Sequence, residues 1–162
     1  HTEAGGEWGS PRADVLIEDV HLSREALLAR YREFDLFVSA SLGEGLGLPV
    51  AEAILAGVPV LANDWGGQRD LLRADAFFPM PHVVSPQPFC SRPDYYAPGQ
   101  RCAMASVEGI AKALRAVART SARKREEMAV AARRALLGRY GQRAVVQRLK
   151  ASRSVRALQR DR

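Results

Sequence analysis

The sequence predicts an α/β fold: a Rossmann-like parallel sheet with flanking helices, followed by basic helices. Two compact apolar runs of strand length, residues 36–40 and 58–62, are typical of strands buried on both faces. A helix-length segment separates them, so the two strands are expected to pair in parallel. The last third of the chain shows the three- and four-residue apolar spacing of helices instead.

The segment before these strands predicts one further strand and one helix. A polar, glycine-rich lead over residues 1–13 precedes DVLIEDV at residues 14–20, which we expect to form a short strand. Ser23 can cap a helix running through Phe34, because its hydroxyl accepts a hydrogen bond from an unpaired backbone N–H of the first turn.

A glycine turn and a second helix follow the strand at 36–40. Pro49 suits the first turn of a helix, where its missing N–H is not needed, so this helix is predicted to begin at about Leu48. Gly57 is expected to end it, because glycine readily takes a positive φ.

The strand at 58–62 leads into a loop at 63–67, at the carboxyl end of that strand, where doubly wound sheets bind their ligands. Another helix is expected to start over residues 68–72. An insertion rich in proline and aromatic residues follows at 77–105, with a short strand expected near 82–85. These segments complete a partial nucleotide-binding domain over residues 14–120.

Basic helices are predicted for the remainder of the chain, residues 121–162. Ser106 can cap the last helix of the preceding domain. Two further helices are expected at 121–140 and 142–158, with Gly141 as the joint.

The composition favours a single cytoplasmic domain. The chain has 162 residues, no run of about 18 apolar residues and no apolar segment typical of a signal peptide. Its only cysteines, Cys90 and Cys102, form no CxxC pair, so a disulfide framework or a zinc site is not expected. Because His1 stands where a methionine would begin a protein, we expect the chain to be processed or to be part of a longer one.

The net charge of +6 hides a division along the chain. Residues 1–111 carry 8 Lys and Arg against 15 Asp and Glu, a net charge of −7. Residues 112–162 carry 16 against 3, a net charge of +13. Such a tail can meet nucleic acid, an anionic membrane surface or an acidic partner, or be a solvated helix face.

One segment combines residue types that specify a ligand, the glycine turn from Gly43 to Gly47. Glycines let the backbone approach a ligand just before unpaired helix N–H groups, which favour a phosphate. Carboxylates flank this turn at Glu44 and Glu52, and each can accept two hydrogen bonds from a diol. A diphosphate between two sugars describes a nucleotide sugar. The GxGxxG and GxxxxGK[ST] patterns are both absent, which disfavours an ordinary NAD or ATP site.

The segment EGLGLPVAEA at 44–53, followed by AGVPV at 56–60 and NDWGG at 63–67, resembles the donor-binding signature of the retaining GT-B glycosyltransferases of family 4. The similarity runs from about Val15 to Leu72, and Asp70 stands where the family commonly has glutamate.

The resemblance implies a role for each matching residue. Glu44, predicted to act in catalysis, would contact hydroxyls of the donor sugar. The backbone of Gly45, Leu46 and Gly47 would approach the sugar and diphosphate, and Glu52 would hold the ribose hydroxyls. Weaker candidates for donor or phosphate contacts are Gly43, Arg69 and His21, the last of these near the base.

The resemblance also implies transfer with retention and without a metal or other cofactor, and the chain has no D-x-D triplet for a divalent ion. The family's donor half opens with a strand, a glycine-rich turn and an Arg/Lys pair that nothing before Val15 can supply. We therefore expect this chain to be an incomplete and inactive part of an enzyme that also has an acceptor domain.

Two alternatives remain at this point. One is a non-catalytic interaction module whose basic tail binds an anionic membrane, at its inner face, or nucleic acid. Tyr140 is the only aromatic residue of the tail after residue 111, which disfavours nucleic acid, and the tail has no strong apolar face for membrane insertion. The other alternative is a GT-B sugar-nucleotide epimerase.

Overall fold

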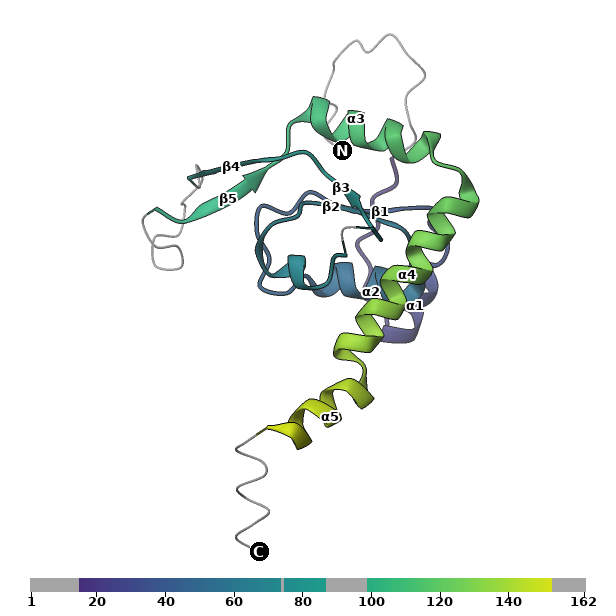
Figure 1. The fold of residues 1–162 in the computed structure, drawn as a ribbon. Helices are drawn as coiled ribbons and strands as arrows, with labels where there is room; N and C mark the ends of the chain where they lie inside the picture. Colours follow the sequence, from purple (N-terminus) through teal and green to yellow (C-terminus); the bar gives the residue numbers. More distant parts are fainter. Residues whose placement is uncertain (1–14, 74, 87–98, 153–162) are drawn as a thin grey trace, which may run out of the picture.

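The computed structural model describes residues 15–73, 75–86 and 99–152. Its centre is a parallel sheet with the strand order β1 (Phe37–Ser39), β2 (Val60–Ala62) and β3 (Phe78–Pro79), as Figure 1 shows. The predicted strands at 36–40 and 58–62 and their parallel pairing are therefore confirmed. The short strand β3 was not predicted.

Side chains of β2 alternate between two apolar clusters and so divide the molecule into layers. Val60 and Ala62 pack on one face with α2 (Leu48–Ala56) and α4 (Ala122–Tyr140). Leu61 points to the other face, where it packs with Ala113 of α3 (Val107–Arg119). The sheet therefore has helices on both faces, as expected of a Rossmann-like half-fold (Figure 1).

The predicted helix boundaries rest on local signals that the structure bears out. Gly57 ends α2 with a φ of 85°. Ser106 accepts a hydrogen bond of 3.0 Å from the backbone N–H of Gly109 and so caps α3. Gly141 joins α4 to α5 (Gln142–Ala151), and a Cβ there would lie 2.3 Å from the carbonyl oxygen of Leu137. Residues 153–158 of the last predicted helix lie outside the described residues.

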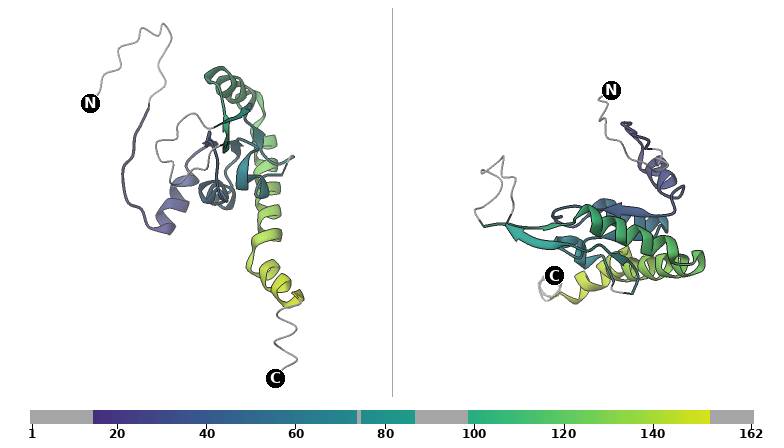
Figure 2. Two further views of the ribbon diagram at one scale, coloured as in Figure 1. Left: turned by 90° about the vertical axis from the view of Figure 1, so that its left-hand side faces the viewer. Right: turned by 90° about the horizontal axis from the view of Figure 1, so that it is seen from above.

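The predicted strand at 14–20 is wrong for its described residues. Residues 15–20 have no strand pairing and leave Val15, Leu16 and Ile17 each more than 75% exposed. Figure 2 shows this segment standing apart from the sheet. A strand needs a neighbouring strand with which to pair, and apolar composition alone does not supply one.

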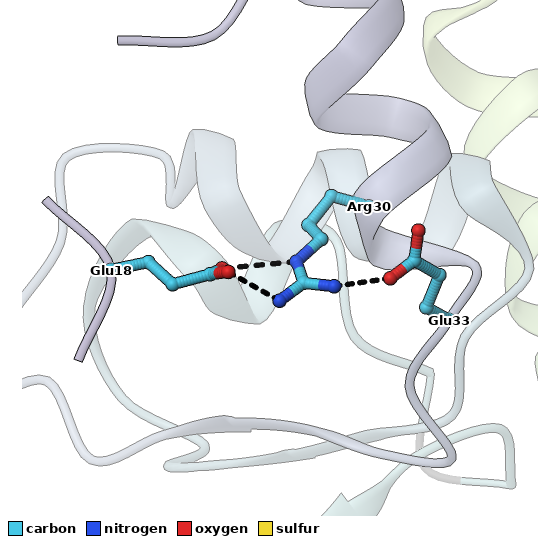
Figure 3. A network of polar contacts seen from close by, with 3 residues as sticks. All are labelled: Glu18, Arg30 and Glu33. Atoms are coloured by element: carbon cyan, nitrogen blue, oxygen red, sulfur yellow. Dashed lines mark hydrogen bonds and ion pairs between the residues drawn. The ribbon is translucent and has the colours of Figure 1, made fainter. Parts of the chain in front are cut away.

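Helix α1 (Arg24–Tyr31) carries the polar contacts of this segment. Ser23 caps the helix as predicted, but the helix ends at Tyr31 rather than at Phe34. Arg30 donates to the carboxylate of Glu18 and also to that of Glu33 (Figure 3). The guanidinium therefore links the extended segment to the end of the helix.

A β-hairpin and a short helix complete the fold, and both change the predictions. The expected strand near 82–85 is β4 (Val83–Pro86), which pairs antiparallel with the unpredicted β5 (Arg101–Met104). The helix expected at 68–72 is instead a 3-10 helix over Gly66–Asp70. Residues 87–98 of the insertion lie outside the described residues.

Candidate functional site

A cavity of about 480 Å³ opens at the carboxyl end of the parallel sheet, where the loop after β1 faces the loop after β2. Its third wall is the start of β5. The lining residues are Leu42, Gly43, Glu44, Gly45, Trp65, Gly66, Gln100, Arg101 and Cys102. The described residues therefore bring one carboxylate, one guanidinium and one indole to the cavity, whose volume is in the range of small-molecule sites.

Hydrogen bonds from both neighbouring walls fix the loop after β1. Its backbone carbonyl groups accept from the other elements, and the bonds are Asn63 Nδ2 to Ser41 O at 2.7 Å, Ala103 N to Leu42 O at 2.9 Å, and Gly67 N to Glu44 O at 2.7 Å. The backbone around Glu44 is thus held in place without the ligand, which favours a preformed site.

Glycine is required where these loops touch. A Cβ at Gly67 would lie 1.8 Å from the carbonyl oxygen of Gly45, closer than side-chain atoms can approach. Gly47, the N-cap of α2, has a φ of 81°, and a Cβ there would meet the Cβ of Gln68 at 3.0 Å. The glycines thus allow the two loops to pack together as well as to approach a ligand.

The structure brings only part of the predicted donor site into this cavity. Glu44, Gly43 and Gly45 line it, and a Cβ at either glycine would meet open space. Leu46 and Gly47 continue from this wall to α2, whose first turn has no side-chain cap. That leaves the helix N-terminus next to the cavity wall with the backbone donors that favour an anion.

Glu52 lies on α2 beside Tyr31 of α1 and does not line the cavity. Burial raises the pKa of the Tyr31 phenol above its ordinary value of 10.0, and the negative charge of Glu52 and a hydrogen bond to it raise the pKa further. The structure therefore places Glu52 beside a tyrosine, whereas Glu44 lines the cavity.

Of the three weaker candidates, Gly43 lines the cavity, whereas Arg69 and His21 lie outside it. Arg69 forms an ion pair with Asp64 at 3.0 Å and lines a separate hollow of about 380 Å³ next to Phe77. His21 is exposed at the end of the unpaired segment before α1.

Residues of the hairpin are the part of the site that the sequence did not reveal. The start of β5 reaches the cavity with Gln100, Arg101 and Cys102, although the sequence predicted no strand at these residues of the insertion. Pairing of β4 with β5 across that insertion is a non-local contact, and the short apolar run CAM at 102–104 is its only signal in the sequence.

Asn63 and Gln68 have buried amide side chains next to the contact between the two loops. Gln68 donates from Nε2 to the backbone oxygen of Asn63, and both side chains are at most 1% exposed. Their remaining amide oxygens have no hydrogen-bond partner in the described part of the chain. The loop after β2 is therefore packed through polar groups, as is typical of ligand-binding edges of a sheet.

Neither a metal cluster nor a membrane span occurs within the described residues. No group of three or more His, Cys, Asp or Glu side chains there could hold a metal ion. No described helix combines the length and the apolar character needed to cross a bilayer.

Comparison with known proteins agrees with this architecture. The model of a family described as family 4 glycosyltransferase in conflict systems matches residues 1–149, which is most of the chain. No curated protein matches it. The chain, a glycosyltransferase domain with a Rossmann-like sheet, belongs to the family 4 glycosyltransferases of conflict systems.

Proposed function

We propose that this chain is the donor-binding part of a retaining GT-B glycosyltransferase and binds a nucleotide-diphosphate sugar in the cavity at Glu44. The observation that carries the proposal is the position of Glu44, whose backbone is fixed by Gly67 and whose side chain lines a sugar-sized cavity. The uncapped first turn of α2 beside it favours the diphosphate.

The proposed chemistry places different demands on carboxylate and backbone. Departure of the nucleoside diphosphate leaves an oxocarbenium-like sugar, so the protein must mainly stabilise the negative charge of the leaving group. The N–H groups around Gly45, Leu46 and Gly47 would approach the diphosphate, while Glu44 would orient the sugar hydroxyls. This scheme needs no metal, because the N-terminus of α2 and the positive side chains that the remainder of the enzyme would supply stabilise the leaving group.

The proposed ribose contact of Glu52 is compatible with the position of its neighbour Tyr31. A carboxylate beside Tyr31 can still accept from a diol, because it has two oxygens and several lone pairs. The proposal therefore assigns Glu52 to the ribose while Tyr31 limits the directions from which hydroxyls can approach it.

We further propose that another α/β segment completes the site. Strand β1 pairs with β2 on one side only among the described strands, and residues 15–20, which combine four apolar residues with Glu18 and Asp19, have no partner among these strands. Added parallel strands would cover both features. The 162-residue chain alone is then expected to bind donor without transferring sugar, and an acceptor domain would belong to the remainder of the enzyme.

Calorimetry and product analysis test this function. We expect the chain to bind at least one of UDP, GDP and ADP, and Glu44→Gln to weaken binding of the corresponding nucleotide sugar more than that of the free diphosphate. No binding of any of these nucleotides by the wild type would contradict the proposal. Products of the completed enzyme would distinguish transfer with retention from epimerisation of the donor.

A second candidate function rests on the exposed surface of α5, which extends beyond the sheet in Figure 1. Val145, Val146 and Leu149 are 37–56% exposed there, next to the exposed cations Arg143 and Arg148. Such a helix fits a peripheral contact with an anionic membrane. Cosedimentation with vesicles of anionic and of neutral lipids tests it, and equal retention by both would exclude a charge-driven contact.

A further inference from the structure

We propose that Arg101 binds an oxyanion carried by the ligand of the Glu44 cavity, so that the hairpin makes this site selective for negatively charged ligands. The inference rests on the proposed function and adds to it a residue outside the loop at residues 40–47, here named the donor loop. The ligand chemistry is a phosphate or carboxylate group, which a guanidinium can bind through two parallel N–H···O bonds.

The hairpin fixes Arg101 at the wall of the cavity. Two residues further along the same strand, Ala103 is fully buried and donates its backbone N–H to the oxygen of Leu42, two residues before Glu44. Cys102 between them is 4% exposed. A backbone hydrogen bond from a buried residue therefore joins β5 to the donor loop, and Arg101 lines the cavity from the hairpin side.

Arg101 retains most of its hydrogen-bonding capacity. Its Nη2 donates to the backbone oxygen of Val84 at 3.0 Å, which orients the side chain along the hairpin. A guanidinium has five N–H donors, so this single bond to a described residue leaves several donors without a partner in the described part of the chain, enough for an oxyanion. Within the described ranges no carboxylate forms an ion pair with Arg101, whereas Arg69 and Arg139 each pair with an aspartate.

The charges of the cavity indicate what it accepts. Among the described residues, Glu44 and Arg101 are the charged side chains that line the cavity, and they stand on different walls. A carboxylate alone would repel an anionic ligand, and the guanidinium offsets that repulsion on the hairpin side. Trp65 also lines the cavity and supplies an apolar face for a sugar ring.

Two sources can supply the oxyanion, and the experiment separates them. One is the diphosphate of the donor; the other is a carboxylate or phosphate on the sugar or on the acceptor. Wild-type chain, Arg101→Gln and the control Arg115→Gln, which removes an exposed cation from α3, are titrated by NMR. The probes are UDP, GDP and ADP in one series and glucose, glucuronate and glucose 6-phosphate in the other.

Arg101→Gln is expected to weaken anionic probes about 10-fold or more, because hydrogen bonds to charged groups are the strong ones. Arg115→Gln should stay within about twofold of wild type. Weaker binding of the nucleotides assigns Arg101 to the diphosphate, and weaker binding of the sugar acids alone assigns it to the sugar or acceptor.

Two results would overturn the inference, and they are distinguishable. Binding of the anionic probes that is unaffected by Arg101→Gln in both series refutes the role of Arg101 and leaves the proposed function standing. Absence of binding of every probe to the wild type at millimolar concentration refutes both.

Discussion

The contact between Gly67 and Gly45 gives a sharp test of how the site is built, through the substitution Gly67→Ala. The added Cβ would lie 1.8 Å from the carbonyl oxygen of Gly45 and 2.5 Å from its carbon. The two loops must then separate by at least about 1 Å to reach a tolerable contact. That shift takes the bond from Gly67 N to Glu44 O, now 2.7 Å, outside hydrogen-bonding distance.

The expected cost follows from these two effects. Loss of the hydrogen bond contributes about 0.5–1.5 kcal/mol, and overpacking of a close contact contributes about 1–3 kcal/mol. We therefore expect Gly67→Ala to lower the free energy of unfolding by about 2–4 kcal/mol. Binding of nucleotides should weaken as well, because the backbone of Glu44 moves with the loop.

Urea denaturation followed by circular dichroism measures this difference, with Gly43→Ala as the matched control. A Cβ at Gly43 meets nothing within 4 Å, and its φ is not among the positive values, so its stability should change by less than about 0.5 kcal/mol. A Gly67→Ala variant within about 0.5 kcal/mol of wild type would refute the close approach of the two loops.

Three further predictions concern the core, the Glu52 contact and a helix cap. Leu136 of α4 is 6% exposed and packs toward the sheet, so Leu136→Ala should lower the free energy of unfolding in urea by about 2–5 kcal/mol. Its neighbour Leu137 is 46% exposed, so Leu137→Ala should lower it far less, and equal effects would contradict the packing of α4. The pKa of Tyr31, followed by ¹³C NMR, should lie above 10.0 and should fall in Glu52→Gln, and an unchanged pKa in the variant would contradict the contact. Because the pKa of Tyr31 is higher in the folded than in the unfolded protein, the contribution of this group to stability is complete below pH 10 and is lost as the pH rises through the folded pKa. Ser106→Ala should cost about 0.5–2 kcal/mol in thermal or urea unfolding, and Ser106→Asp should restore most of it, whereas no loss on removing the hydroxyl would contradict the cap.

Local signals made the central part of the fold predictable from the sequence. Pro49 and Gly57 set the ends of α2, and serine caps set the starts of α1 and α3. These signals act within a few residues of the chain, so no tertiary information is needed to interpret them. The glycine turn with Glu44 was found in the same way, since its residue types lie together.

Non-local pairing explains what the sequence did not predict. β3 contains two residues, one of them Pro79, and forms only because β2 lies beside it. Residues 15–20 have strand composition but no partner strand. Arg101 reaches the cavity that Glu44 lines through the pairing of β4 with β5, which no short sequence window contains. The placement of Glu52 beside Tyr31 likewise depends on how α1 packs against α2.

Binding of a nucleotide sugar beside Glu44 is the central claim, and a ¹H–¹⁵N NMR titration of the 162-residue chain tests it most directly. UDP, GDP and ADP and their glucose conjugates are added to millimolar concentration, so that even weak binding is detected. We predict saturable shifts confined to the backbone amides of residues 42–47, 65–67 and 100–102, with the sugar-dependent part lost in Glu44→Gln. Absence of shifts with every nucleotide, or shifts confined to the basic helices α4 and α5, would contradict the claim.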